Sequence, residues 1–307
     1  MRLRLYENYR FVLYAPFYAA HTIGAYTAEG LEVELAPSPG VGKAEAALID
    51  GAVDVLWAGP MRVMKHHDDN PGSPLVCFAE IVCRDPFSIV GREPNPGFRL
   101  ADLASMRFAS VSEVPTPWLC LQHDLRGVGL NPDRLDRIGD RSMTDNLAAL
   151  RDGRLDAAQF FEPVVEEALA TGAGHLWYAA SSRGRTTYTA FVTTREKLAI
   201  HAEPLLRMAR AIYHTQQWLR SNPASAIAEM IAGFFPALDR AVLARALERY
   251  QKQDVWGIDP VLPEDGFDRL RQSLVSGGFI RRPVSYEICV DTRLALQAVN
   301  STERSIR

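Results

Sequence analysis

The sequence predicts an α/β protein with two lobes of similar build that face each other across a ligand cleft. The main observation is a repeated phrase: Ala-Leu-x-Asp-Gly-x-x-Asp occupies residues 47–54 and returns at 149–156. Each copy is followed by a short apolar run and then by a loop that contains a proline. The length of 307 residues is a third indication, because it suits about two domains.

Each copy of the repeat reads as a helix, a stop and a buried strand. Gly51 and Gly153 follow the helices, where a residue that tolerates a positive φ is favoured. The short apolar runs at 53–57 and 155–161 are typical of buried parallel strands. Ligands of open α/β sheets bind beyond the carboxyl ends of the strands, so the loop after each strand is expected at the ligand site.

The chain around each copy repeats the same order of elements. In the first half we expect a strand at 3–6, a helix from near Pro16, a stop at Gly30 and a strand at 31–35. In the second half we expect a strand at 106–111, a helix capped by Thr116 with Pro117 in its first position, and stops at Gly127 and Gly129. Segments 84–98 and 188–198 are candidate crossovers between the lobes, and the chain from about Pro204 is expected to be mostly helical.

Charge and composition exclude several classes of partner. A net charge of -3 and a pI of about 6.2, with no basic block, disfavour nucleic acid and anionic membranes. No apolar stretch approaches the roughly 18 residues of a membrane helix, so membrane insertion is not expected. Cys77, Cys83, Cys120 and Cys289 are scattered among apolar neighbours and are predicted to be buried free thiols.

The first residues lack the apolar core and small-residue cleavage site of a secretory signal. We therefore expect a cytoplasmic protein if Met1 is the natural start, and a periplasmic one if a signal peptide has been removed.

The order of motifs resembles the solute-binding proteins of ABC transporters for nitrate, sulfonates, taurine and thiamine pyrimidine precursors. The matching stretches are 15–20 (APFYAA), 24–35, 47–55, 149–157, Glu162-Pro163, 216–230 and 285–295. The resemblance implies the type II periplasmic-binding-protein fold, with a two-strand hinge and the ligand in the cleft. It divides the chain into lobe 1, residues 1–90 plus 192–307, and lobe 2, residues 91–191. A small-molecule ligand, a possible ABC permease and a monomeric state are the implied partners and assembly.

Two loops of lobe 1 carry candidate ligand contacts. The first holds Tyr9, Arg10, Tyr14 and Phe17, whose rings can stack on a flat ligand or simply pack against the next helix. The second holds Trp57, Gly59, Pro60, Met61 and Arg62. Gly59 lets the backbone approach a ligand, and Arg62 can pair with an anion or remain solvated.

Two loops of lobe 2 complete the predicted cleft. Residues 112–118 contain Ser112, Thr116 and Trp118 and lead into a helix N-terminus, which suits an anionic group. Pro115 and Pro117 remove donors there and Glu113 adds negative charge, so a neutral or aromatic ligand is favoured over a free sulfonate. The last loop holds Phe161 and Glu162; Glu162 either accepts ligand N–H bonds or only favours the next helix.

Weaker candidates rest on the family pattern, which puts Glu80, Asp85, Tyr188 and Trp256 near the crossovers. Tyr14, Trp118 and Phe161 together predict an aromatic clamp. Truncating Tyr14 or Trp118 to Ala is expected to weaken binding by about 1–3 kcal/mol.

The stretch MKHHDDN at 64–70 raises a metal site and an enzyme as alternatives. Adjacent helical residues do not share a face and no further cluster completes a ligand set, so we expect a solvated helix end and no metal. The fungal thiamine pyrimidine synthase shares the fold and uses pyridoxal phosphate with its own histidine; Lys65, His66 and His67 lie in the comparable region. The cysteine-rich run of that enzyme is absent here, which counts against its chemistry.

The leading hypothesis is therefore a binding protein that closes two lobes on a small heteroaromatic or carboxylated molecule, without a cofactor and without chemistry. It serves an ABC uptake system or is a cytoplasmic relative of such proteins. A synthase-like enzyme is the alternative, and a regulatory ligand-binding module is a third possibility.

Overall fold

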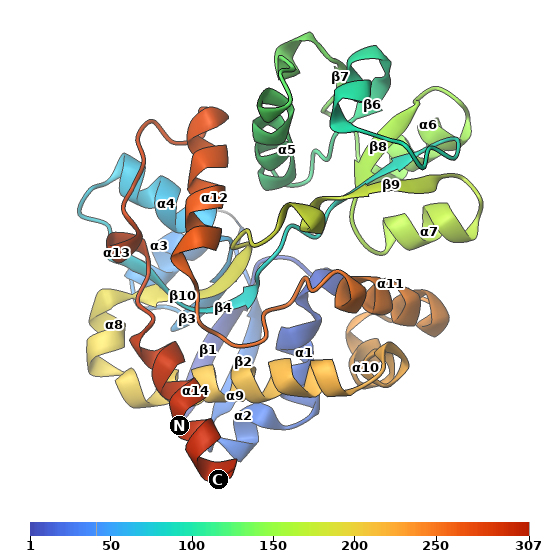
Figure 1. The fold of residues 1–307 in the computed structure, drawn as a ribbon. Helices are drawn as coiled ribbons and strands as arrows, with labels where there is room; N and C mark the ends of the chain where they lie inside the picture. Colours follow the sequence, from blue (N-terminus) through green and yellow to red (C-terminus); the bar gives the residue numbers. More distant parts are fainter. Residues whose placement is uncertain (41, 307) are drawn as a thin grey trace.

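The computed structural model describes residues 1–40 and 42–306, with side chains to residue 301. Two lobes, each built on one five-stranded sheet, face each other (Figure 1). The strand order is β2-β1-β3-β10-β4 in lobe 1 and β7-β6-β8-β5-β9 in lobe 2. Each sheet is parallel except for the fourth strand, because β10 and β5 run antiparallel to both neighbours. The predicted α/β fold with two lobes of similar build is confirmed.

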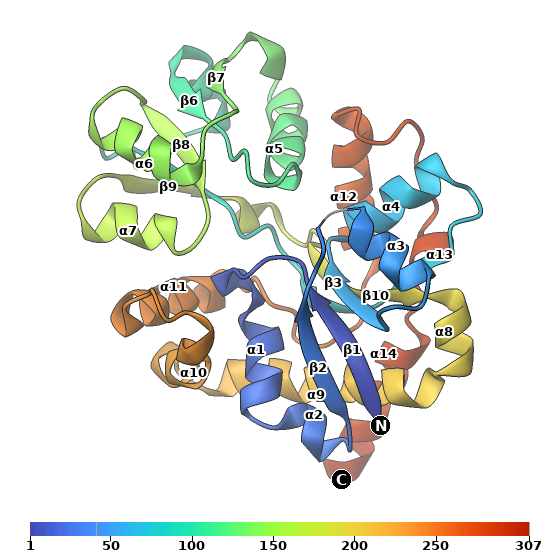
Figure 2. The ribbon, with the colours of Figure 1, turned by 180° about the vertical axis from the view of Figure 1, so that it is seen from behind.

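The strands of lobe 1 are β1 (Arg2–Glu7), β2 (Glu32–Pro37), β3 (Val55–Ala58), β4 (Leu75–Val82) and β10 (Thr189–Thr194). Those of lobe 2 are β5 (Ser88–Gly91), β6 (Arg107–Ala109), β7 (Asp136–Ile138), β8 (Ala157–Phe160) and β9 (His175–Ala179). The strands predicted from the repeat are β3 and β8, which occupy the same central place in the two sheets. Figure 2 shows β1, β2 and β3 from behind.

The repeated phrase builds the same joint twice. Gly51 and Gly153 adopt positive φ values of 81° and 73°, which turn the chain out of the preceding helix. The last aspartate of each copy then anchors the central strand. Asp54 accepts a hydrogen bond of 2.8 Å from the backbone N–H of Arg4, and Asp156 accepts one of 2.8 Å from that of Arg107. Both strands consequently start after this aspartate, later than predicted.

The helices of lobe 1 are α1 (Ala15–Thr22), α2 (Ala25–Ala28), α3 (Lys43–Ile49), α4 (Pro60–Asp69), α8 (Arg195–Ile200), α9 (Ala202–Ser221), α10 (Ala224–Ile231), α11 (Arg240–Lys252), α12 (Glu264–Ser276), α13 (Tyr286–Cys289) and α14 (Arg293–Ile306). Those of lobe 2 are α5 (Thr116–Gly127), α6 (Met143–Arg151) and α7 (Val164–Ala170). The region after Pro204 is mostly helical, as expected. No described helix is both long and apolar enough to cross a membrane.

Two crossovers connect the lobes, the first at the start of the predicted segment 84–98 and the second before the predicted segment 188–198, which instead forms β10 and part of α8. One runs from β4 to β5 through residues 83–87, and the other from β9 to β10 through residues 180–188. β5 pairs in the sheet of lobe 2 and β10 in that of lobe 1. The sheets therefore change a few residues before the boundaries drawn at 90 and 192. The short helical turn Ala180–Arg183 carries Arg183, whose guanidinium bonds Asp85 of the other crossover and Asp124 of α5.

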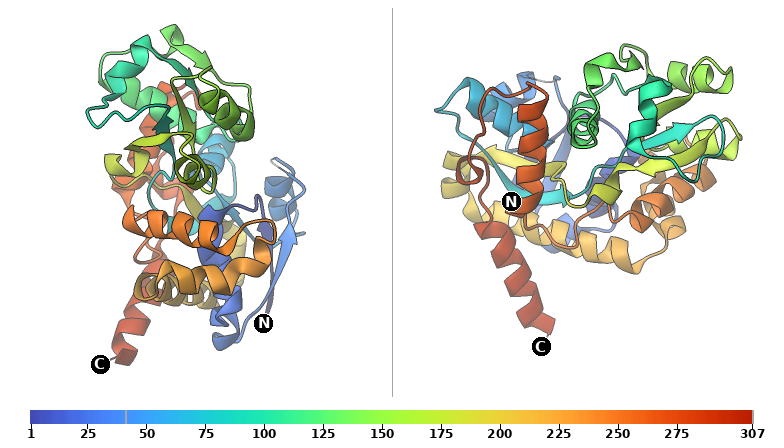
Figure 3. Two further views of the ribbon diagram at one scale, coloured as in Figure 1. Left: turned by 90° about the vertical axis from the view of Figure 1, so that its right-hand side faces the viewer. Right: turned by 45° about the horizontal axis from the view of Figure 1, so that its top comes forward.

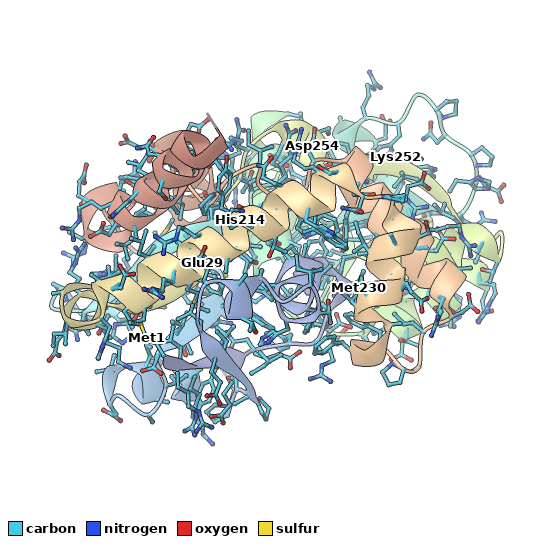
Figure 4. All side chains as sticks on the ribbon, turned by 90° about the horizontal axis from the view of Figure 1, so that it is seen from below. Met1, Glu29, His214, Met230, Lys252 and Asp254 are labelled. Atoms are coloured by element: carbon cyan, nitrogen blue, oxygen red, sulfur yellow. The ribbon has the colours of Figure 1, made fainter. Side chains whose placement is uncertain are left out.

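The helices that follow β10 close lobe 1 from below. α9 crosses the underside of the lobe, where Glu29 and His214 lie near each other (Figure 4). Arg210 of α9 donates to Glu29 at 2.8 Å and so ties the long helix to the end of α2. α14 packs on α9 and projects from the body at the C-terminus (Figure 3). α11 and α12, in contrast, reach up to lobe 2 on two sides of the cleft (Figure 1).

The four cysteines are buried free thiols, as predicted. Burial raises the pKa of Cys83, Cys120 and Cys289 to about 12, so these thiols stay protonated at neutral pH.

Candidate ligand-binding site

A cavity of about 60 Å³ lies between the lobes and is partly open to solvent. Its walls come from the loop after β1, the start of α4 after β3, the two crossovers, the loop before α5, and the residue after β8. Two of these walls lie at the carboxyl ends of β3 and β8, the strands that the repeat predicted. The lining residues are Asn8, Tyr9, Phe11, Leu13, Tyr14, Glu45, Ala58, Gly59, Met61, Arg62, Phe87, Val114, Pro115, Thr116, Phe161 and Tyr188.

Aromatic side chains from both lobes form most of the wall. The ring of Phe11 stands edge-on to that of Phe161 with centroids 4.7 Å apart, which brings lobe 1 and lobe 2 into contact. Phe161 also packs on Phe87 at 4.9 Å, and Phe87 on Tyr188 at 6.1 Å. Flat, apolar walls of this kind suit a ring that stacks or meets them edge-on.

A few polar groups face this aromatic wall. Asn8 donates its Nδ2 to the carbonyl of Trp57 at 2.9 Å, which leaves its buried Oδ1 without a partner. The buried hydroxyl of Tyr188 has no partner either. Arg62 lines the cavity half-buried, and among the described residues no ion pair or hydrogen bond engages its guanidinium. Among the described lining residues, Asn8 and Tyr188 thus have an unpaired acceptor and an unpaired hydroxyl, and Arg62 has an unpaired cation.

Thr116 joins the lobes at the cavity in a way that the sequence did not predict. Pro115, rather than Thr116, precedes the first turn of α5, and no side chain caps that helix. The Thr116 hydroxyl instead contacts the sulfur of Met61 in the opposite lobe. The predicted N-cap is therefore wrong, but Thr116 is a lining residue.

Half of the predicted contact residues line the cavity: Tyr9, Tyr14, Gly59, Met61, Arg62, Thr116, Phe161 and Tyr188. Their contact with a ligand stays a prediction. The others, which do not line it, are Arg10, Phe17, Trp57, Pro60, Glu80, Ser112, Trp118 and Glu162.

Arg10 does not line the cavity, because its side chain is bound by the carboxylate at the end of β1. Its guanidinium donates to Glu7 at 2.9 and 2.7 Å, and Tyr18 donates to the same carboxylate at 2.5 Å. Burial acts to raise the pKa of Glu7, but the bonds from Arg10 and Tyr18 lower it overall. Arg10 therefore holds the loop in place from behind.

Phe17, Trp57 and Pro60 lie beneath the cavity instead of in its wall. Phe17 and Trp57 are fully buried and stack with centroids 4.3 Å apart. The Tyr14 ring, which does line the cavity, rests on Trp57 at 5.5 Å. Pro60 is buried as the first residue of α4. These residues support the wall.

Ser112 and Trp118 belong to the body of lobe 2. The Ser112 hydroxyl donates to the carbonyl of Arg141 at 2.7 Å. The Trp118 ring lies under the guanidinium of Arg137 at 4.2 Å and packs in the core beneath α5. The predicted clamp therefore lacks Trp118, and Phe11 and Phe87 stand in the wall beside Tyr14 and Phe161.

Glu162 faces lobe 1 instead of the cavity. It is 1% exposed and accepts a bond of 2.7 Å from Arg249 of α11, while its backbone N–H donates to the Tyr250 hydroxyl at 3.1 Å. Arg249 also donates to Glu166 at 2.9 Å, and Arg245 pairs with Glu166 as well. Burial raises the pKa of Glu162 to about 7, and Arg249 opposes this rise. Glu162 thus connects lobe 2 to α11 of lobe 1.

Glu80 lies behind the hinge. It is 1% exposed, and burial raises its pKa to about 8. Its backbone N–H donates to the carbonyl of Pro260 at 2.7 Å, and its carbonyl accepts from Gln216 at 3.0 Å. Trp256, another weak candidate, donates its ring N–H to the carbonyl of Leu13 at 2.8 Å and so supports the first loop from below.

The side chains of residues 65–69 bond one another and nearby residues. Lys65 pairs with Asp69, His66 bonds Ser73, His67 bonds the carbonyl of Leu75, and Asp68 receives bonds from Arg281. His67 and Asp68 are 3% exposed, so this is not the solvated helix end that we expected. Among the described residues no cluster of His, Cys, Asp and Glu is arranged for a metal ion. Lys65, His66 and His67 do not line the cavity.

The sequence analysis missed Asn8, Phe11, Leu13, Glu45, Ala58, Phe87, Val114 and Pro115. Asn8, Phe11 and Leu13 stand in the loop already singled out for Tyr9 and Tyr14, so the loop itself was the available signal. Phe87 lies on a crossover, and a crossover must pass the cleft. Glu45 sits in the first turn of α3 and accepts from the N–H of Gly42 at 2.7 Å. Nothing in its local sequence marks it as a cleft residue.

Comparison with known proteins identifies the family. The sequence model of the family described as "NMT1/THI5 like" matches residues 13–226. The chain belongs to the NMT1/THI5-like family. Among curated proteins, the one described as "Putative binding protein YtlA" of Bacillus subtilis is 24% identical over 96% of this chain and 89% of its own length.

Solved structures establish the fold of this NMT1/THI5-like protein. The periplasmic aliphatic sulphonate binding protein SsuA of Escherichia coli matches with a TM-score of 0.73 at 17% identity, over 92% of this chain and 94% of that one. The desulfurization enzyme DSZB matches with a TM-score of 0.71 at 15% identity, over 98% and 99%. The type II periplasmic-binding-protein fold is therefore confirmed, and the same fold is used by a binding protein and by an enzyme.

Proposed function

We propose that this NMT1/THI5-like protein is a solute-binding protein whose lobes close on a small heteroaromatic or carboxylated ligand. The observation that carries the proposal is the cavity between the lobes. Aromatic rings from both lobes meet there, and the Asn8 Oδ1 and the Tyr188 hydroxyl are buried without partners. Buried polar groups are normally satisfied, so unpaired buried atoms on residues that line a cavity are candidates for hydrogen bonds with a bound molecule.

The same cavity favours binding over chemistry. Among the described lining residues there is no histidine, cysteine or lysine to act as a base or nucleophile. Lys65, His66 and His67 are engaged in α4, so the synthase-like alternative has no histidine at the cavity. The fold is also that of periplasmic SsuA and of an enzyme, DSZB, so the fold alone does not decide between the two functions.

As the binding component of an ABC-type uptake system, the exported protein would deliver its ligand to a permease as a monomer. If Met1 starts the natural chain, the same closure would serve a cytoplasmic carrier or sensor. Lobe closure depends on contacts that the ligand makes with both lobes at once.

Native mass spectrometry of the freshly purified protein tests the proposal. We expect a complex with one small molecule that denaturation releases chemically unchanged. Incubation with pyridoxal phosphate and iron is the control for the enzyme alternative, because synthase chemistry consumes a histidine and changes the protein mass at His66 or His67. A mass change there, with product released, contradicts a binding function.

A further inference from the structure

The electrostatics of the cavity define the ligand more narrowly. We propose that the ligand is a single-ring aromatic acid whose anionic group is held by Arg62 and Tyr188 and whose N–H donates to Asn8. This inference rests on the proposed binding function and deepens it.

The Arg62 guanidinium, which has no carboxylate partner among the described residues, indicates that the ligand carries an anionic group. Other arginines at the cleft are neutralised: Arg10 pairs with Glu7 at 2.7 Å and Arg249 with Glu162 at 2.7 Å. The Arg62 guanidinium forms no such pair among the described residues, although it lines the cavity. A half-buried guanidinium beside apolar rings binds a carboxylate strongly, because its hydrogen bonds are charge-assisted.

Two helix N-termini add to the positive potential at this place. α4 begins at Pro60 beside Gly59, and α5 begins at Thr116 across the cavity. Such ends carry partial positive charge and favour an anion, while Pro60 and Pro117 each remove one N–H donor, so the contribution is the potential of the helix end more than direct hydrogen bonds. The carboxylate of Glu113, whose charge the sequence analysis set against an anionic ligand, faces the start of α6. Its Oε1 accepts from the N–H of Met143 at 2.8 Å.

The hydroxyl of Tyr188 supplies a neutral donor. The side chain is 8% exposed, its oxygen has no partner, and burial raises its pKa well above the usual value. The hydroxyl therefore keeps its proton and can donate to a ligand oxygen. Tyr188 lies on the crossover before β10, so this bond would also tie the ligand to the hinge.

Asn8 requires the opposite kind of atom. Its Nδ2 already donates to the Trp57 carbonyl at 2.9 Å, so the free Oδ1 can only accept. A ligand N–H or O–H satisfies it, whereas a ligand oxygen acceptor leaves it buried and unpaired. Glu45, the carboxylate in the lining, is 7% exposed and already accepts from Gly42.

The cavity is smaller than a site for one aromatic ring. Its volume is about 60 Å³, while an apolar cavity of roughly 150 Å³ is known to hold benzene. A ligand with one ring and a carboxylate therefore requires the lobes to move apart, and a single ring requires the least movement.

Isothermal titration calorimetry with a matched set of probes tests the ligand class. We expect pyrrole-2-carboxylate to bind with one site. Furan-2-carboxylate, which replaces the ring N–H by an acceptor oxygen, should bind about tenfold more weakly, because it leaves Asn8 unpaired. Pyrrole-2-carboxamide and 2-(aminomethyl)pyrrole lack the anion and should bind weakly or not at all. Changing the ligand is preferable to changing Asn8, which also anchors Trp57.

Two variants locate the bonds on the protein. Arg62→Gln should weaken pyrrole-2-carboxylate binding by about 10- to 100-fold and so bring it close to that of the uncharged carboxamide. Tyr188→Phe should weaken it by about fivefold with an unchanged Tm, because the lost hydroxyl has no partner in the protein. Arg154→Gln is the matched control, since this exposed arginine pairs only with Asp152 on lobe 2.

The outcomes separate this inference from the proposed function. If taurine, nitrate or 2-(aminomethyl)pyrrole binds while the pyrrole carboxylate does not, the ligand class is overturned and the binding function stands. Equal losses in Arg62→Gln and Arg154→Gln also overturn it. If no probe binds and no co-purified molecule is found, both fail together.

Discussion

The two lobes are built alike, yet two of the contacts between them have opposite character. On one side, α7 of lobe 2 meets α11 of lobe 1 through charges, with Arg249 between Glu162 and Glu166. On the other side, α5 meets α12 mainly through apolar groups, where Leu119 packs in the cluster that contains Leu274, and Arg126 adds a hydrogen bond of 3.0 Å to Ser276 at the exposed end. Charged pairs depend on geometry and on salt, whereas apolar contacts do not require one geometry. The charged contact therefore holds the lobes in one particular geometry, and the apolar contact adds attraction without requiring that geometry.

The largest effect is expected from breaking the charged contact. Arg249→Met leaves Glu162 and Glu166, both less than 5% exposed, without their shared cation. The free energy of unfolding should fall by about 3 kcal/mol, and ligand affinity should fall as well. Urea unfolding at low and high salt measures the first, and calorimetry the second.

Arg245→Met is the control for that experiment. Its side chain is 49% exposed and contacts Glu166 only, so the loss should be about 0.5 kcal/mol. If Arg249→Met and Arg245→Met lower the free energy of unfolding equally, the positive charge of α11, and not the bond from Arg249 to Glu162, holds the lobes together.

The apolar side should respond in a different way. Leu119→Ala removes a side chain that is 7% exposed and that reaches Gly277 at the end of α12. We expect a loss of about 2 kcal/mol that does not change with salt. Leu176→Ala, at a 40% exposed position of the same lobe, should cost little. A salt-dependent loss in Leu119→Ala would remove the distinction between the two contacts.

The charged contact also contains two carboxylates with opposite responses to pH. Burial raises the pKa of Glu162 to about 7, so the folded state binds this proton more tightly than the unfolded state. The stability contribution of Glu162 is therefore present below its ordinary pKa and is lost as pH rises towards 7. Burial acts to raise the pKa of Glu166 too, but Arg245 and Arg249 lower it overall. The contribution of Glu166 to the free energy of unfolding is therefore present above the ordinary pKa of a glutamate and is lost as pH falls below it.

Glu162→Gln should therefore flatten the fall in stability between about pH 4.5 and 7 by on the order of 1 kcal/mol. Glu166→Gln should flatten the fall at acid pH instead. Thermal unfolding of both variants from pH 3 to 8 measures the slopes. Changes of slope, relative to the parent protein, that have the same sign in the two variants contradict the assignment.

The sequence predicted what depends on local chain chemistry. Gly51 and Gly153 mark helix ends because few other residues adopt their positive φ, and the apolar run after each glycine could only be a buried strand. The cleft loops followed from strand direction. The repeat thus located two of the segments that line the cavity, and the matching order of elements around it located two more.

The direction of individual side chains could not be predicted, because distant elements decide it. Phe161 and Glu162 are neighbours, but only Phe161 lines the cavity. Glu162 is turned by Arg249, which lies 87 residues later in the chain. Trp118 is held in the same way by Arg137 from the next strand. No pattern near either residue carries that information.

The smallest expected effect tests the likeness of the lobes rather than their difference. Asp54 and Asp156 make the same 2.8 Å bond to a backbone N–H of the neighbouring strand, so Asp54→Ala and Asp156→Ala should each cost about 1 kcal/mol. Asp54→Ala should cost slightly more, because Asp54 also pairs with Lys197 at 3.0 Å. The other aspartates of the repeat, Asp50 and Asp152, are exposed, and their truncation should change stability by only a few tenths of a kcal/mol. If Asp50→Ala lowers the free energy of unfolding in urea as much as Asp54→Ala does, the hydrogen bond to the neighbouring strand does not explain why the phrase occurs in both lobes.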